Sequence, residues 1–115
     1  MSIAADLIRG HTDAIILARL MEQDSYGYEI NKTIARQTDG RFELKEATLY
    51  TAFRRLEESG CILSYWGNEQ TGARRKYYSI TPLGREVYAQ LFAEWQQAKD
   101  IIGRLMYMEG ERNDG

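Results

Sequence analysis

Residues 47–60, with the sequence ATLYTAFRRLEESG, decide the fold of this chain. Three apolar side chains in this stretch, Leu49, Phe53 and Leu56, are spaced four and three residues apart, so they share one face of a helix. Gly60 suits the left-handed position that commonly follows a helix. The opposite face of the predicted helix displays hydroxyl and guanidinium groups, from Thr48, Thr51, Arg54 and Arg55. The stretch therefore predicts an amphipathic helix with a polar outer face.

Two further helices are predicted before this one. Apolar residues recur at helical spacing from 6 to 21, with Gly10 as the weak point, which predicts one first helix. Ser25 is suited to cap the start of a second helix, and residues 39–40, Asp and Gly, end it. The apolar positions of this second helix repeat every four residues, at Tyr26, Ile30 and Ile34.

The period of the pattern changes after Gly60. Residues 61–66 and 74–80 are rich in aromatic and β-branched side chains and are separated by a turn-forming run, which predicts a β-hairpin. Thr81 followed by proline is typical of a helix start, because proline at the first helical position loses no hydrogen bond. We therefore expect a long last helix over about 82–108.

That last helix has a heptad pattern of apolar residues. The positions are spaced alternately by three and four residues, at Tyr88, Leu91, Trp95, Ala98, Ile102 and Leu105. A helix of this length spans on the order of 40 Å, which is more than a three-helix body can cover. We therefore predict that the seam forms a homodimer interface, and that residues 109–115 fray.

The 115 residues have room for one hydrophobic core, so we expect a single domain over 1–115. We expect this domain to be mainly α with a small β-hairpin. Three helices, a hairpin and a long helix are the order of a winged helix-turn-helix over about 5–80, with a C-terminal dimerisation helix. In that fold the third helix enters the major groove of DNA and the hairpin, called the wing, contacts the backbone or the minor groove.

Charge is distributed unevenly along the chain. The net charge is −2, which by itself disfavours a nucleic-acid binder. Residues 41–80, however, carry seven basic and five acidic side chains, so this part is +2 and the remainder −4. A basic face on an acidic body is compatible with DNA binding, and the overall acidity keeps open the alternative of a winged-helix module that binds protein without specific DNA binding.

The candidate DNA contacts are polar or basic residues of the third helix and of the wing. Three consecutive cations on a short strand repel one another, so their presence favours an anionic binding partner. Lys45 near the helix N-terminus strengthens attraction for phosphate. The set predicted from the residues themselves is Lys45, Thr48, Thr51, Arg54, Arg55, Arg74, Arg75 and Lys76. For Arg54 and Arg55 the alternative is a solvated face paired with the glutamates that follow.

Several motifs resemble the PadR family of transcriptional regulators. They are Tyr26-Gly27-Tyr28, residues 47–50 with 55–60, and Arg74 to Tyr78 before Thr81 and Gly84. The resemblance covers essentially the whole chain. It implies a homodimer that represses a promoter by binding an inverted repeat, with Tyr50 and its neighbours at the DNA backbone.

The resemblance also implies a small-molecule site. Some similar regulators sense aromatic or drug-like compounds at the dimer interface, where a tryptophan of the last helix stacks on the ligand. Trp95 matches that position, and the candidate ligand-binding residues are Leu7, His11, Phe92, Trp95 and Lys99. Packing within the dimer interface is the alternative role for Trp95.

Other function classes find little support in the sequence. His11 and Cys61 are the single residues of their types, so neither a metal site nor a nucleophilic catalytic set can be assembled, and no enzyme activity or cofactor is expected. Cys61 is expected to be a buried apolar residue. With no secretory leader and no apolar run of roughly 20 residues, we expect a cytoplasmic protein without a membrane partner.

Overall fold

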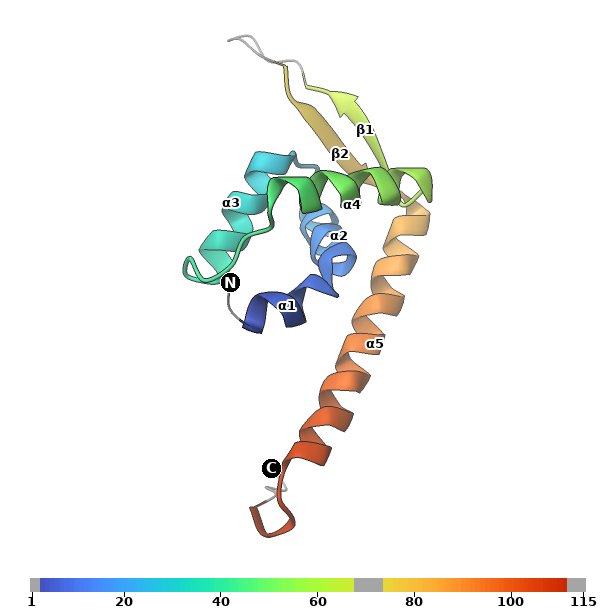
Figure 1. The fold of residues 1–115 in the computed structure, drawn as a ribbon. Coiled ribbons are helices and arrows are strands. Elements are labelled where there is room, and N and C mark those ends of the chain that lie inside the picture. Colours follow the sequence, from blue (N-terminus) through green and yellow to red (C-terminus); the bar gives the residue numbers. More distant parts are fainter. Residues whose placement is uncertain (1–2, 68–73, 112–115) are drawn as a thin grey trace.

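The computed structural model describes residues 3–67 and 74–111 and shows a mainly helical chain with a two-stranded hairpin and a long last helix (Figure 1). The elements are α1 (Ile3–Arg9), α2 (Thr12–Glu22), α3 (Gly27–Gln37), α4 (Glu46–Glu58), β1 (Ile62–Trp66), β2 (Lys76–Ile80), α5 (Pro82–Met106) and the 3-10 turn η1 (Glu109–Glu111). The predicted fold class is confirmed. Most of the predicted hairpin turn and the end of the predicted frayed tail lie outside the described residues.

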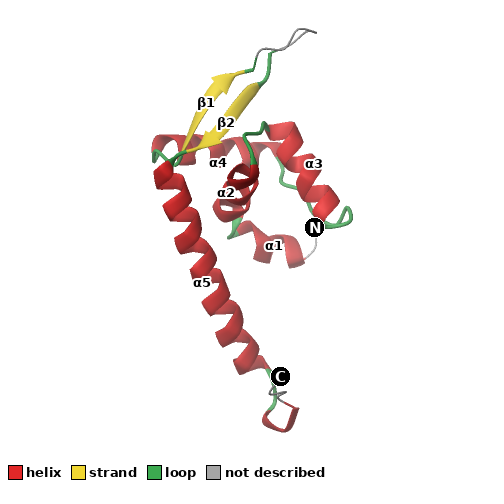
Figure 2. Cartoon of the chain, turned by 180° about the vertical axis from the view of Figure 1, so that it is seen from behind, coloured by secondary structure: helices red, strands yellow, loops and turns green. Residues whose placement is uncertain are grey.

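The hairpin and α5 start from the same corner of the helical body and run in opposite directions (Figure 2). Strands β1 and β2 pair antiparallel, with Ile62 opposite Ile80 and Trp66 opposite Lys76. The hairpin stands above α4, and α5 leaves the body on the other side (Figure 1). The molecule is therefore elongated, with principal extents of 62, 30 and 23 Å.

The prediction of one continuous first helix is wrong, because the helix is interrupted between Arg9 and Thr12 and forms two helices, α1 and α2. Gly10, which has a low helix propensity, stands at the break. The Thr12 hydroxyl donates to the Arg9 carbonyl at 2.8 Å, and Thr12 is buried. A separate helix of seven residues, α1, therefore precedes α2, and in the described part of the chain four helices rather than three precede the hairpin.

The expected cap of α3 is also wrong. Helix α3 begins at Gly27 with Tyr26 in the cap position, one residue later than predicted. Ser25 instead pairs with Tyr78 of β2, with the two backbone N–H groups donating to the two carbonyls at 3.2 and 2.8 Å. Ser25 thus forms an isolated β-bridge beside the hairpin.

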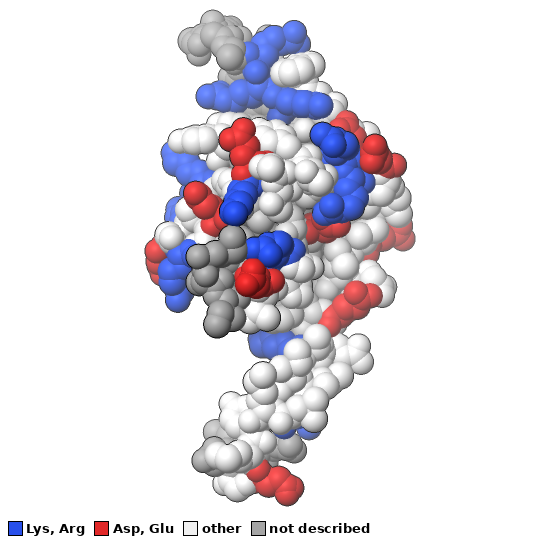
Figure 3. Space-filling model, viewed as in Figure 1, with Lys and Arg blue, Asp and Glu red and all other residues white. Residues whose placement is uncertain are grey.

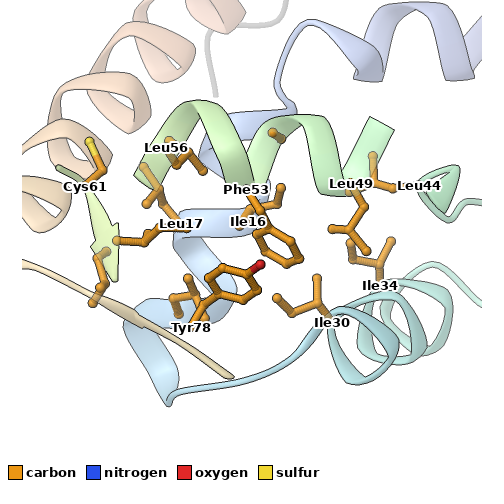
Figure 4. Close-up of a cluster of buried hydrophobic side chains, with 14 residues drawn as sticks. Ile16, Leu17, Ile30, Ile34, Leu44, Leu49, Phe53, Leu56, Cys61 and Tyr78 are labelled. Carbon is orange, nitrogen blue, oxygen red and sulfur yellow. The ribbon is translucent and has the colours of Figure 1, made fainter. Parts of the chain in front are cut away.

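The core joins α2, α3, α4 and the hairpin (Figure 4). The predicted stripe of α4 is confirmed, since Leu49, Phe53 and Leu56 are all buried. The rings of Phe53 and Tyr78 stack with centroids 3.9 Å apart and an interplanar angle of 18°. Burial raises the pKa of the Tyr78 hydroxyl above its usual value, with a smaller contribution from Glu57. The core therefore ties α4 directly to the wing.

Helix α4 ends at Glu58, and Gly60, the predicted left-handed residue after the helix, has a φ of +81°. A glycine there avoids the strain that an L side chain meets in the left-handed region. The buried Cys61 follows, as expected, and opens the hairpin.

The start of α5 is confirmed as a Thr-Pro cap. The Thr81 hydroxyl accepts from the Gly84 N–H at 3.0 Å and donates to the Gly60 carbonyl at 2.6 Å. Gly84 is buried, and a side chain there would place its Cβ 2.1 Å from the Cys61 carbonyl oxygen. The cap therefore fastens α5 to the end of α4.

We predict that Thr81→Ala lowers the free energy of unfolding by about 1–2 kcal/mol, because the helix loses its side-chain cap. Thr81→Ser retains the hydroxyl and should keep most of the stability. Urea unfolding at a fixed protein concentration measures both. Equal stability of the two variants would contradict a capping role for the hydroxyl.

Helix α5 has two different halves. Val87, Tyr88 and Leu91 in its first half pack against the core and are half-buried. Beyond them the apolar side chains are exposed, with Ile102 48% and Leu105 78% exposed. Among the described residues, none of the helices combines the length and the apolar character that crossing a lipid bilayer requires.

Candidate nucleic-acid interface

The outer face of α4 is open to solvent. Thr51, Arg54 and Arg55 are exposed, and Lys45 is exposed in the cap position just before the helix. Thr48 is half-buried. With Tyr50, the six predicted contacts of this region therefore lie on or beside one helix, and five of them are exposed.

Tyr50 is 46% exposed near the start of α4. Its ring meets Phe53 edge to face, with centroids 5.7 Å apart. The hydroxyl lies against Gly27 of α3, where an added Cβ would come within 2.8 Å of the oxygen. Glycine at position 27 thus lets α3 and α4 approach closely and holds the Tyr50 hydroxyl at the groove between them.

Arg55 differs from the other candidates because it has an internal partner. Its guanidinium forms an ion pair with Asp13 of α2, and the Arg55 Nε lies 3.3 Å from Asp13 Oδ2. The hydrogen bond to Asp13 raises the pKa of Arg55. The pair is partly exposed, so it stabilises little by itself. Its effect is to orient Arg55 toward α2, and a role of Arg55 in DNA contact stays a prediction.

The wing presents all three predicted cations at its surface. Arg74, Arg75 and Lys76 are exposed, and Figure 3 shows basic side chains gathered over the hairpin. Each cation lies over an aromatic ring: Arg74 over Trp66 at 5.4 Å, Arg75 over Tyr26 at 4.9 Å and Lys76 over Tyr78 at 5.9 Å. Each of the three wing cations therefore has an aromatic ring beside it.

The predicted small-molecule site is brought together only in part. A recess of about 420 Å³ lies where α2, α4 and α5 meet, and the rings of His11 and Trp95 line it with centroids 5.3 Å apart. Leu7, Phe92 and Lys99 do not line this recess. Leu7 is exposed on α1, Lys99 is exposed on α5, and Phe92 stacks on Tyr88.

Charged residues that the sequence reasoning did not assign to this site complete the recess. They are Arg9, Asp13, Arg55 and Glu94. Asp13 and Arg55 lie 42 positions apart in the chain, so no local pattern could have paired them.

The predicted dimer seam divides at Trp95. Tyr88 and Leu91 are half-buried and pack on the core of the same chain, whereas Trp95 is 42% exposed. The later members of the seam, from Ala98 to Leu105, are exposed. The projecting half of α5 is almost entirely free of charge on the face seen in Figure 3.

Nothing in the described part of the chain gathers three or more residues able to hold a metal ion. Its solvent-facing features are instead the polar outer face of α4, the basic residues of the hairpin and the exposed apolar side chains in the projecting half of α5. A helix-turn-helix followed by such a hairpin defines the winged-helix class of DNA-binding proteins.

Comparison with known proteins identifies the family within that class. Residues 16–90 match the transcriptional regulator PadR-like family. The chain belongs to this family and is therefore a DNA-binding transcriptional regulator. The family consists of transcriptional regulators, which are not enzymes.

Several relatives are similar over nearly their whole length. A transcriptional regulator from Clostridium thermocellum is 50% identical, with a TM-score of 0.83 over 92% of this chain and 100% of that chain. A PadR family transcription regulator from Clostridium difficile R20291 is 37% identical, with a TM-score of 0.73 over 84% and 99%. An uncharacterized protein of Lysinibacillus sphaericus is 46% identical over 94% of this chain and 97% of that protein.

Proposed function

We propose that the chain is a homodimeric repressor that binds an inverted repeat in its own promoter region. The observation that carries this proposal is the placement of the polar α4 face and the basic wing toward one end, with the apolar half of α5 projecting away from them. Two copies joined along α5 would present two recognition helices at half-sites about 34–36 Å apart, one turn of B-DNA, or a multiple of it.

The proposal includes the organisation of the chain. Residues 1–115 fold as a single domain in which the winged helix-turn-helix of about 5–80 carries the DNA contacts and the helix of about 82–108 carries the dimer contacts. The regulator works in the cytoplasm, on double-stranded DNA.

Preference for one DNA sequence tests the proposal. A labelled duplex of the promoter region and a scrambled duplex of equal length are titrated with the protein at about 150 mM salt, where non-specific binding is weak. Binding of the promoter duplex at least about 1,000-fold more tightly supports a specific regulator. Equal binding of both duplexes would contradict it.

We predict that changing Arg74 and Arg75 together to alanine weakens promoter binding and flattens its salt dependence. Each lost phosphate contact should lower the slope of log affinity against log salt by about 0.9. Mobility shifts over a salt series measure the slope. Arg104→Ala, at the far end of α5, is the control that should leave it unchanged. An unaltered slope in the wing variant would show that the wing does not contact phosphate.

A second function, binding of a protein partner without specific DNA binding, is favoured by the net charge of −2. Retention of the promoter duplex, but not the scrambled one, at about 150 mM salt separates the two functions.

Release by a small aromatic effector extends the repressor proposal. The exposed Trp95 and His11 form two walls of the recess beside α4, so an aromatic compound can stack there. The chain has two tryptophans, and Trp66→Phe leaves Trp95 as the single reporter. Quenching of its fluorescence by an aromatic compound, together with loss of bound promoter duplex, supports the effector role. Quenching without release would contradict it.

A further inference from the structure

A row of tyrosines crosses the face of the wing that points away from α4. Tyr78 faces Phe53 in the core, so its neighbour Tyr77 points to the opposite face of the hairpin. Tyr65 pairs with Tyr77 across the strands, and their rings stack with centroids 5.7 Å apart. Tyr26 meets the other edge of Tyr77 at 5.2 Å. The row therefore joins both strands of the wing to the segment that opens α3.

Tyr65, at one end of this row, and strand β2 are both attached to the segment between α2 and α3. The Tyr65 hydroxyl donates to Asp24 Oδ2 at 2.6 Å, and this hydrogen bond raises the pKa of Tyr65 to about 12. Beside it, Ser25 and Tyr78 exchange two backbone hydrogen bonds. A two-stranded hairpin alone is marginally stable in water, so these contacts supply support that the strands lack.

Arg75 lies on the same face, two residues before Tyr77. Its guanidinium carbon is 4.9 Å from the centroid of the Tyr26 ring, within the range of a cation–π contact. Stacking engages the flat face of a guanidinium, whereas its N–H donors lie in the plane of the group. A contact with Tyr26 is therefore compatible with hydrogen bonds from Arg75 to a phosphate.

We propose that Tyr26 is a positioning residue for Arg75, and that the Tyr65–Asp24 hydrogen bond holds the hairpin where Tyr26 can reach that arginine. Tyr26 acts through Arg75 and makes no DNA contact of its own. The inference rests on the proposed binding of DNA by the wing and assigns to the tyrosine row the task of fixing the distance between the wing cation and the helix-turn-helix.

A double-mutant cycle tests this inference. Promoter-duplex affinity is measured by fluorescence anisotropy for the full chain, Tyr26→Leu, Arg75→Ala and the double variant. Because coupled residues are non-additive, Tyr26→Leu should weaken binding about fivefold in the parent chain and less than about twofold beside Arg75→Ala. The salt slope should fall in both single variants, which a loss of folding alone would not produce.

Tyr28→Leu is the matched control. Tyr28 lies two positions further on, and its ring is near Lys32 rather than the wing. Any effect of Tyr28→Leu should be the same factor with and without Arg75. Equal factors for Tyr26→Leu in the two backgrounds, or no effect of Tyr26→Leu at all, would overturn the inference. Failure of the parent chain to prefer its promoter over a scrambled duplex would instead remove the proposed function, and this inference with it.

A second variant keeps the test decisive if Tyr26→Leu does not fold. Tyr65→Phe retains the ring and removes only the hydroxyl that reaches Asp24. It should weaken binding about twofold to threefold in the parent chain and have no effect beside Arg75→Ala. Tyr107→Phe, at the end of α5, controls for loss of a tyrosine hydroxyl remote from the wing. An equal effect of Tyr65→Phe in both backgrounds would overturn the inference.

Discussion

Replacing Ile102 by glutamate is expected to leave each winged helix folded while converting the proposed dimer to a monomer with a large loss of promoter affinity. Ile102 lies in the projecting half of α5, 48% exposed and outside the core, so the single chain loses no packing. A carboxylate on the proposed seam would lie in an apolar interface without a partner. Two linked sites gain on the order of 100-fold or more in affinity over one, and the monomer forfeits that gain.

Analytical ultracentrifugation and anisotropy with the promoter duplex measure the two halves of this prediction. Gln97→Glu is the matched control, since it introduces the same carboxylate on the same helix. Position 97 lies roughly 200° around the helix from Trp95 and 100° from Ala98, outside the seam. It should remain dimeric and bind normally. If Ile102→Glu sediments as a dimer and binds with full affinity, α5 does not join the two copies.

The elements that the sequence predicted well are those set by neighbouring residues. The spacing of Leu49, Phe53 and Leu56 determines which side of α4 is buried, whatever lies opposite. Gly60 and Thr81 mark a helix end and a helix start through local backbone geometry and one side-chain hydrogen bond. Such signals act within one helical turn, so a single sequence displays them completely.

Contacts between distant residues account for what the sequence did not predict. Serine commonly caps helices, but the backbone of Ser25 instead forms a β-bridge with Tyr78. Tyr65 and Asp24 are 41 positions apart, and their hydrogen bond depends on the path of the whole hairpin. The sequence shows the basic residues of the wing, but it does not show which aromatic rings lie against them.

The largest expected effect on stability comes from Phe53, because its ring joins the recognition helix to the wing. Phe53 is 1% exposed and stacks on Tyr78 of β2, which in turn pairs with Ser25 before α3 (Figure 4). The proposed DNA-binding face of α4 and the strand that carries Lys76 are therefore joined by this buried contact. A cavity at this point would loosen both parts of the proposed interface together.

We predict that Phe53→Ala lowers the free energy of unfolding by about 3–5 kcal/mol, the usual cost of deleting a buried aromatic ring. That is a large part of the roughly 5–15 kcal/mol available to a domain of this kind, so promoter binding should weaken as well. Phe53→Leu keeps most of the buried volume and should cost about 1.5 kcal/mol. Urea unfolding at one protein concentration measures both, since the stability of a dimer depends on concentration. A loss below about 1 kcal/mol for Phe53→Ala would mean that the hairpin is held by its tyrosine row and not by the core.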